Sequence, residues 1–395
     1  MVATALKKTN TNPSVAQRLH GSPTMEAAEK VRRLLAEKTD VVRFDIGEPD
    51  FDTPRHISEA GTEAISKGFT HYTSPRGIPE LRDALVHDLR QRNGLEAGTD
   101  QLVFYPGSKF AIFSVFSLLC EEGDEVIIED PLWPTYASIL EFLRAVPLRV
   151  QNWNEIEATS SVEGMISKIT SKTKAVLVNS PSNPTGSTVP EREIARLLEE
   201  CDKRGIPLIL DRIYSALSYD GENSKVPAYD LEDGNLIIVS GFSKEFAMTG
   251  WRLGYSVASK NFTKLLCDFQ ENTTSCPASF VQKAAVAALT GPREWQTKMN
   301  SEYRERRDLM LQGIGQIPGW KCAPPPGAFY CFPSIPSSDS VSYSKKLLEE
   351  KYVSLIAGAH FGPSGEGHLR LSYTTSKDRI VEGMKRIKEF ASEHE

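Results

Sequence analysis

Between about residues 100 and 260, short apolar runs alternate with amphipathic helical segments. The apolar runs are nearly continuous, which is typical of strands that helices cover on both faces. Regular alternation of this kind indicates parallel βα units, so we predict an α/β domain with a mainly parallel central sheet and helices on both faces. The clearest strands are residues 102–105, 125–129, 175–179, 208–211 and 236–240, and the clearest helices are residues 109–119 and 191–204.

The two ends of the chain follow a different pattern. After Gly291 come a long charged helix through Arg307, connections rich in proline and serine, short strands, and an amphipathic helix from Lys377 onward. Before residue 50 there is only a helix over residues 25–37 and an extended stretch over residues 41–46. These elements predict an α+β unit to which both ends of the chain contribute.

Length sets the number of domains. A chain of 395 residues exceeds what one hydrophobic core usually holds, so two domains are expected. We predict a large domain over residues 50–290 and a small domain formed by residues 1–49 together with residues 291–395.

Composition excludes several classes of protein. The net charge of −6 argues against a polyanion such as nucleic acid as partner. No apolar run approaches the roughly 20 residues of a membrane span, and residues 1–13 form a polar tail without the apolar centre of a secretion signal. The six cysteines show no spacing for zinc or for a disulfide framework. We expect a cytoplasmic protein with small-molecule partners and no metal.

The most informative segment begins at the end of a predicted strand and reads SGFSKEFAMTGWRLGY. Lys244 follows that strand on a turn, at the edge of the sheet where α/β proteins bind ligands. Burial or nearby positive charge lowers the pKa of a lysine, and its free amine can then attack an aldehyde. Arg252 offers a planar fork that suits a phosphate. A lone lysine on a loop is usually a solvated surface residue. The neighbouring Ser240, Ser243 and Arg252 favour a functional site here.

This segment resembles the lysine segment of the class I and II aminotransferases, which have the fold-type-I pyridoxal-phosphate architecture, and further motifs of that family recur along nearly the whole chain. The resemblance implies that pyridoxal 5'-phosphate is the cofactor. It implies that Lys244 holds the cofactor as a Schiff base and then moves the substrate proton, and that Ser243, Arg252 and Ser240 bind the phosphate.

Two motifs at strand ends bear on the cofactor ring. An aspartate such as Asp211, taken alone, more often caps a turn. The resemblance implies that Asp211 pairs with the pyridine nitrogen and keeps it protonated, so that the ring withdraws electrons. It implies that Tyr214 and Asn183, the latter in the turn NSPSNPTG, hydrogen-bond the cofactor O3′. Relatives often carry an acidic residue where this chain has Arg212, and the effect of that change is open.

The run Gly107-Ser108-Lys109 opens a helix directly after a predicted strand. Free N–H groups and the positive end of the helix dipole make such a start an anion site, although the tripeptide alone is more often an ordinary helix start. The resemblance implies that the backbone amides of Ser108 and Lys109 bind the cofactor phosphate. Relatives commonly carry Gln or Glu at the next position, where this chain has Phe110, and its consequence for substrate choice is open.

Two aromatic residues complete the expected cofactor site. Trp133 resembles the ring that stacks on the pyridine face, with a core tryptophan as the plainer alternative. Tyr72, in the run HYTSPRG, resembles the tyrosine that reaches the phosphate of the neighbouring subunit. The resemblance therefore implies a homodimer with shared active sites.

The same resemblance implies how substrate binds. Gly47, in the run GEPDFDTP, matches the glycine loop near the substrate carboxylate, and Arg370 matches the arginine that binds this carboxylate bidentately. Asn183 and Trp133 belong to the same site. Lys109 falls where prokaryotic-type aspartate aminotransferases have a lysine that meets the distal carboxylate. Dicarboxylic amino acids are favoured, while aromatic residues near this position leave neutral or aromatic substrates open.

We therefore predict an aminotransferase that moves the amino group of an L-amino acid to a 2-oxo acid, with 2-oxoglutarate as the expected acceptor, in two half-reactions. A carbon–sulfur β-lyase on the same fold would use the same cofactor residues, but the run MTGWRLGY is more similar to the transferases. A transcription regulator with an aminotransferase-like domain would carry a DNA-binding domain ahead of the Gly47 loop, and we expect none here.

Overall fold

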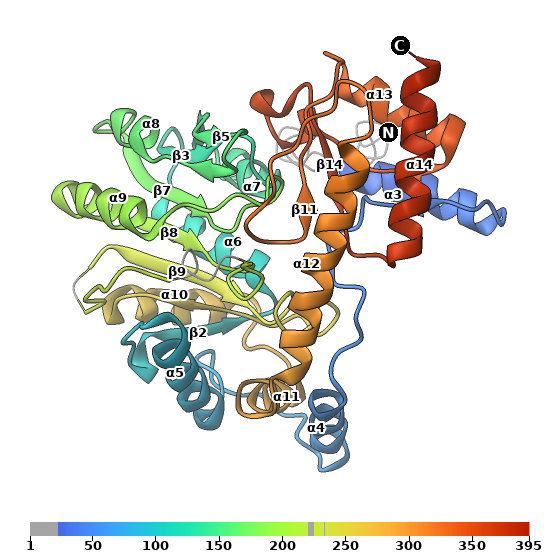
Figure 1. The fold of residues 1–395 in the computed structure, drawn as a ribbon. Coiled ribbons are helices and arrows are strands. Elements are labelled where there is room, and N and C mark those ends of the chain that lie inside the picture. Colours follow the sequence, from blue (N-terminus) through green and yellow to red (C-terminus); the bar gives the residue numbers. More distant parts are fainter. Residues whose placement is uncertain (1–22, 220–224, 233, 395) are drawn as a thin grey trace, which may run out of the picture.

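The computed structural model describes residues 23–219, 225–232 and 234–394. Its centre is a seven-stranded sheet in which every strand but β10 runs in the same direction, in the order β2-β10-β9-β8-β7-β3-β4. The strands are β2 (Leu102–Tyr105), β3 (Glu125–Glu129), β4 (Val146–Val150), β7 (Thr173–Asn179), β8 (Leu208–Asp211), β9 (Leu236–Gly241) and β10 (Gly254–Val257). The predicted α/β fold with a mainly parallel sheet is confirmed (Figure 1).

Helices cover both faces of this sheet, because successive side chains of a strand point to opposite faces. Along β7, Val176 and Val178 join one hydrophobic core, whereas Ala175 and Leu177 join the core on the other face. The first core is covered by α4 (Arg55–Ser66), α5 (Pro79–Asn93), α8 (Glu163–Ser167), α9 (Glu191–Arg204) and α11 (Ser279–Thr290). The second is covered by α6 (Ser108–Leu119), α7 (Thr135–Phe142) and α10 (Lys260–Thr273).

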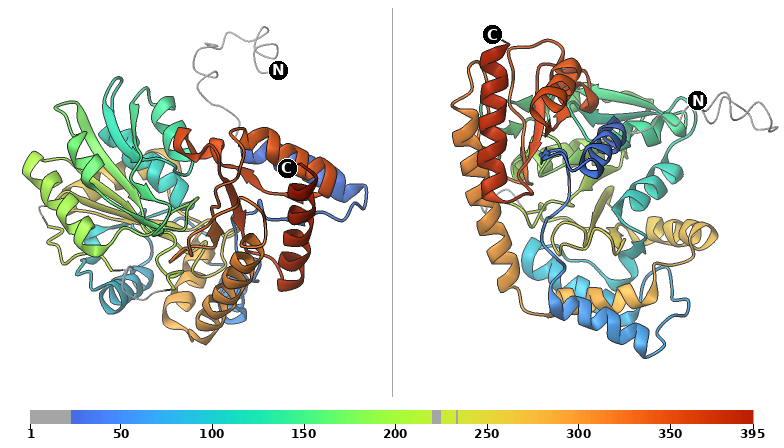
Figure 2. Two further views of the ribbon diagram at one scale, coloured as in Figure 1. Left: turned by 45° about the horizontal axis from the view of Figure 1, so that its top comes forward. Right: turned by 90° about the vertical axis from the view of Figure 1, so that its right-hand side faces the viewer.

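Segments from both ends of the chain meet in a second unit (Figures 1 and 2). A parallel strand pair joins β1 to β12, and a three-stranded antiparallel sheet has the order β11-β14-β13. Its long helix α12 packs along α14, and both enclose one hydrophobic core with the small sheets. Its elements are α3 (Pro23–Ala36), β1 (Val42–Arg43), α12 (Glu294–Ile314), β11 (Tyr330–Cys331), α13 (Ser340–Lys351), β12 (Val353–Ser354), β13 (Ile356–Ala357), β14 (Leu369–Ser372) and α14 (Lys377–Glu393).

We call this second unit the small domain, and the seven-stranded sheet with its helices the large domain. Their exact limits near residues 50 and 290 stay a prediction. Short elements complete the chain: η2 (Thr99–Gln101), β5 (Trp153–Asn154), β6 (Thr159–Ser160), η3 (Gly358–Phe361) and η4 (Pro363–Gly365).

The structure adds two strands of the large sheet that the sequence analysis did not assign. β4 contains Pro147 and Arg149, which interrupt its apolar pattern at the sheet edge, and β10 is only four residues long. The extended stretch at residues 41–46 forms a strand only over Val42–Arg43, and the charged helix runs beyond Arg307.

No helix in the described part of the chain is both long and apolar enough to span a membrane. The polar N-terminal tail predicted at residues 1–13 lies outside the described residues.

Candidate active site

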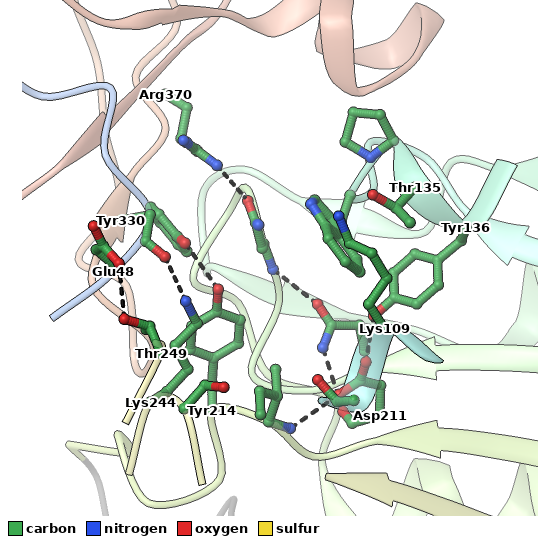
Figure 3. A pocket seen from close by; sticks show the side chains of 18 of the residues that line it. Glu48, Lys109, Thr135, Tyr136, Asp211, Tyr214, Lys244, Thr249, Tyr330 and Arg370 are labelled. Carbon is green, nitrogen blue, oxygen red and sulfur yellow. Dashed lines mark hydrogen bonds between the residues drawn. The ribbon is translucent and has the colours of Figure 1, made fainter. Parts of the chain in front are cut away.

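A cavity of about 560 Å³ lies at the carboxyl ends of the parallel strands and is closed on one side by the small domain (Figure 3). Ligands of open α/β sheets bind at this edge because the loops that follow the strands converge there. Of the residues that the sequence predicts for the site, the cavity brings together all but Ser240 and Tyr72. The residues that line it are Gly47, Ser108, Lys109, Trp133, Asn183, Asp211, Tyr214, Ser243, Lys244, Arg252 and Arg370.

Lys244 lies on the turn after β9, beside Ser243, and its amine points into the cavity (Figure 3). The Nζ atom donates to the carbonyl of Gly47 at 2.5 Å. Burial lowers the pKa of this lysine from 10.5 to about 8, and the nearby charges of Arg370 and Arg252 act in the same direction. A fraction of the amine is therefore uncharged near neutral pH, as a nucleophile or general base requires.

Asp211 ends β8 and lies at the bottom of the cavity, almost fully buried. Its carboxylate accepts hydrogen bonds from the Tyr136 hydroxyl at 2.6 Å and from the Ile213 amide at 2.9 Å. Burial raises the pKa of Asp211 from 3.8 to about 6, although these hydrogen bonds oppose the shift. A cationic nitrogen placed against this carboxylate would stabilise its charged form.

The anion-binding end of the cavity is built by Ser108 and Arg252. Ser108 begins α6, and the leading amides of a helix have no acceptor within it. A side-chain carbon at Gly107 would lie 2.2 Å from the Arg252 guanidinium, and one at Gly254 would lie 2.3 Å from the Ser108 nitrogen. Gly107 also has a φ of 90°. Two glycines thus let the helix start and the guanidinium converge on one space, which suits a phosphate.

Arg370 comes from β14 of the small domain and reaches the opposite side of the cavity (Figure 3). Its Nη1 donates to the Asn183 side-chain oxygen at 3.0 Å, and its Nη2 donates to the Asp45 carbonyl at 2.8 Å. The guanidinium is also held between two rings, 4.6 Å from the centroid of Tyr330 and 5.0 Å from that of Phe361. This buried guanidinium has a fixed orientation, as bidentate recognition of a carboxylate requires.

Tyr330 is a residue of the cavity that the sequence analysis missed. Its hydroxyl lies 2.8 Å from the Tyr214 hydroxyl, and a side chain at Gly47 would approach the same oxygen to 2.8 Å. Tyr136, Phe361 and other unpredicted residues also line the cavity. The run that contains Trp133 also contains Tyr136, but neither Tyr330 nor Phe361 carries a local sequence signal, because each depends on contacts between distant segments.

Two predicted phosphate ligands lie outside the cavity lining. Ser240 lies in β9, and its buried side chain donates to the Arg212 carbonyl at the end of the neighbouring strand at 3.2 Å. Its predicted contact with the phosphate is therefore not supported by the geometry. Tyr72 is 89% exposed and lies at a surface groove with residues of the segment Cys276 to Phe280.

The two departures from the family pattern lie outside the cavity lining as well. Phe110 packs in an aromatic cluster, with ring centroids 5.8 Å from Phe113 and 6.5 Å from Phe269, so its side chain does not line the cavity. Arg212 is buried and its Nη1 donates to the Ser180 carbonyl at 2.9 Å, where it supports the turn that carries Asn183.

Comparisons with known proteins show the family of this chain. Residues 39–387 match the family described as aminotransferase class I and II. The chain is 36% identical over 384 residues to a probable aspartate/prephenate aminotransferase of Aquifex aeolicus, with 95% of this chain and 97% of that protein covered. It is 35% identical over 382 residues to an aspartate aminotransferase of Bacillus subtilis, with 94% and 97% covered. The aspartate aminotransferase of Thermus thermophilus with maleate has a similar structure, with a TM-score of 0.90 and 34% identity. The match covers 96% of this chain and 100% of that chain.

The fold and the lining of the cavity define an enzyme that uses pyridoxal phosphate. The chain belongs to the class I and II aminotransferases. The predictions of an aminotransferase and of its cofactor are confirmed, and the lyase alternative is not favoured.

The lining itself fits pyridoxal phosphate. The cradle formed by Ser108, Gly107 and Arg252 suits the phosphate, and the buried Asp211 carboxylate suits a protonated ring nitrogen. Trp133 lines the same cavity, and its ring is perpendicular to that of Tyr136 at a centroid distance of 5.2 Å. Lys244 has an amine with a lowered pKa, which suits attachment to the cofactor aldehyde.

Proposed function

We propose that this aminotransferase takes dicarboxylic L-amino acids, aspartate or glutamate, as donors and 2-oxoglutarate as acceptor. One observation carries the proposal: two cations, Arg370 on β14 and Lys109 on α6, enter the same cavity from different elements (Figure 3). A dicarboxylic amino acid has one carboxylate for Arg370 and a second for Lys109. The similarity to proteins named aspartate aminotransferase supports the same choice.

Lys109 is held toward the cavity by an aromatic ring. Its Nζ lies 5.0 Å from the centroid of the Trp133 ring, an arrangement in which the ring attracts the cation. Partial desolvation and the charge of Arg252 lower the pKa of Lys109. A carboxylate bound here would offset the repulsion between the two cations, and this favours an acidic donor side chain.

The proposed division of roles follows from the contacts. Bound pyridoxal phosphate supplies a carbonyl that accepts the amino group and a pyridine ring that withdraws electrons from the substrate Cα. Lys244 takes the proton from Cα, Arg370 holds the α-carboxylate, and Asp211 balances the charge of the ring nitrogen. The small domain, which contributes Arg370, excludes water from the reacting atoms when it closes on substrate.

A donor panel tests the proposal. With 2-oxoglutarate as acceptor, aspartate or glutamate should give a higher kcat/KM than alanine, phenylalanine or tyrosine. A preference for a neutral or aromatic donor would contradict the dicarboxylate assignment and leave the aminotransferase assignment intact.

Replacing Lys109 should change which donors are used. Lys109→Met removes the charge and keeps an aliphatic stem against Trp133. A charge-assisted hydrogen bond contributes about 1.5–3 kcal/mol, so kcat/KM for aspartate and glutamate should fall by about 10- to 100-fold. The values for alanine and phenylalanine should change little, since these donors have no distal carboxylate.

Two further variants control this measurement. Lys109→Ala removes the stem as well and should show the same selective loss, while Lys109→Arg, which keeps a cation, should retain part of the preference. The backbone amide of residue 109 is present in all three. Equal responses across the donor panel would mean that the ammonium only faces solvent, and would remove the case for acidic donors.

We also propose a homodimer in the cytoplasm, with Tyr72 completing the active site of the second copy. The Tyr72 side chain is 89% exposed beside a groove, so it is accessible for a contact with a second copy. In sedimentation velocity at assay concentration, the active species is expected to be a dimer. A stable, fully active monomer would contradict this expectation.

A complementation experiment tests the sharing of sites. The Tyr72→Phe homodimer should have weakened cofactor affinity in both of its active sites. The Lys244→Ala homodimer should be inactive in both of its active sites. The hybrid of the two variants has one site with Lys244 from one subunit and Tyr72 from the other, so half of its sites should regain wild-type cofactor affinity. If no site recovers, Tyr72 does not act across the interface.

A further inference from the structure

The two domains are joined beside the cavity by the side chain of Asp130. Asp130 follows β3 in the large domain, whereas η3 and η4, over residues 358–365, belong to the small domain. Its Oδ2 accepts from the Ser364 amide at 3.0 Å, and its Oδ1 lies 3.5 Å from Nη1 of Arg149 on β4. Asp130 is almost fully buried, and Arg149 is only partly exposed.

Backbone contacts reinforce this junction. The carbonyl of Phe361 accepts from the Leu132 amide at 2.9 Å, and Nη1 of Arg149 lies within 3.5 Å of the same carbonyl. One arginine therefore bridges the Asp130 carboxylate and the Phe361 carbonyl. The segment Gly358 to Ser364 is therefore held against the large domain at two points, Phe361 and Ser364, by largely buried polar contacts, and burial strengthens such contacts.

Gly362, between η3 and η4, allows the backbone to approach Asp130 closely. A side-chain carbon at Gly362 would lie 1.8 Å from the Asp130 carboxylate oxygen, and the backbone of Gly362 has a φ of 133°. Only glycine lets the loop approach this closely. The carboxylate and the glycine thus form one packed unit, which indicates that the close approach of the two domains is specified here.

This junction bears on substrate through Phe361. The Phe361 ring lines the cavity, and its centroid lies 5.0 Å from the Arg370 guanidinium. Trp133, which also lines the cavity, follows Asp130 by three residues. The contacts of Asp130 therefore connect a large-domain segment and a small-domain segment that both line the cavity.

We propose that Asp130 is a positioning residue that holds the Phe361 and Arg370 side of the pocket at the spacing needed to bind the α-carboxylate of any substrate. In the described structure it makes no hydrogen bond or ion pair with Ser108, Arg252 or Asp211. Its loss should weaken substrate binding and leave the cofactor in place. This effect differs from that of Lys109, which concerns the distal carboxylate alone.

The test measures KM and kcat of Asp130→Ala with L-aspartate, with L-alanine and with 2-oxoglutarate. Loss of a charge-assisted contact should raise KM about 10- to 100-fold for all three, because each carries the same carboxylate. The kcat value and the cofactor content and absorption spectrum should stay near those of the wild type. Asp130→Asn keeps an acceptor for the Ser364 amide and loses the charge that faces Arg149, so its KM values should be intermediate.

A matched control removes an exposed carboxylate of the same domain. Glu122 pairs with Arg144 at the surface, and Glu122→Ala should leave every KM unchanged. Unchanged KM values in folded Asp130→Ala, or a loss of cofactor equal to the loss of substrate affinity, would overturn the proposal. If Asp130→Ala does not fold, wild-type KM values in Asp130→Asn would overturn it, and raised values for all three substrates would support it.

Discussion

Lys244→Ala is expected to abolish amino-group transfer. The variant lacks the amine that we propose both attaches the cofactor and moves the substrate proton, and general acid–base catalysis alone contributes about 10²- to 10⁴-fold. Turnover should therefore fall on the order of 10⁴-fold or more, measured with a donor and 2-oxoglutarate. The phosphate cradle at Ser108 and Arg252 does not involve the lysine amine, so some cofactor should still bind without covalent attachment.

Lys260→Ala, at an exposed lysine on α10, is the matched control and should have wild-type activity. An ordinary rate for Lys244→Ala would refute the assignment of Lys244.

The lowered pKa of Lys244 adds a stability test that does not depend on turnover. Without cofactor, the Lys244 amine has a pKa of about 8 in the folded protein, against the ordinary value of 10.5 in the unfolded chain. Below pH 8 the buried ammonium is unfavourable, and this penalty is lost as pH rises from about 8 to 10.5, where the unfolded chain binds the extra proton. Lys244→Met without cofactor should therefore resist urea better than the wild type at pH 7, and the difference should shrink as pH rises from about 8 to 10.5.

Asp211→Asn is expected to have the second largest effect. Asparagine keeps the shape of the side chain but cannot balance a positive ring nitrogen, so the ring would withdraw electrons less well. Loss of a charge-assisted contact contributes about 1.5–3 kcal/mol, which corresponds to a fall in kcat of about 10- to 100-fold. The folded state should persist, because the change is small in volume. Stopped-flow measurement of the first half-reaction would isolate this step.

Tyr136→Phe serves as the comparison for Asp211→Asn. The Tyr136 hydroxyl lowers the pKa of Asp211, so its removal should raise that pKa. If the charged carboxylate is required, activity falls as pH drops through this pKa, and the acid limb of the pH profile should move to higher pH in Tyr136→Phe. Wild-type kcat in Asp211→Asn would show that the carboxylate is not needed at the ring.

Much of the large domain follows from local sequence. Runs such as residues 125–129 and 208–211 became strands with the predicted bounds, because apolar residues of this length are buried on both faces of a parallel sheet. β4 and β10 could not be read in the same way. Proline and arginine interrupt the first, and the second is held in an antiparallel position by its neighbours.

The sequence by itself determined the fold class, the family and most of the residues that meet in the cavity, because the large-domain motifs around Ser108, Asn183 and Lys244 directly follow strands that end at one edge of the sheet. Only the tertiary structure decided the contacts between distant segments. Arg370 meets Asn183 across 187 residues, and Asp130 meets Ser364 across 234. Such pairs depend on how the small domain packs against the large one. Local pattern does not encode that packing, so Tyr330 and Phe361 had no signal in the sequence, while Ser240, which had one, donates to the Arg212 carbonyl instead of lining the cavity.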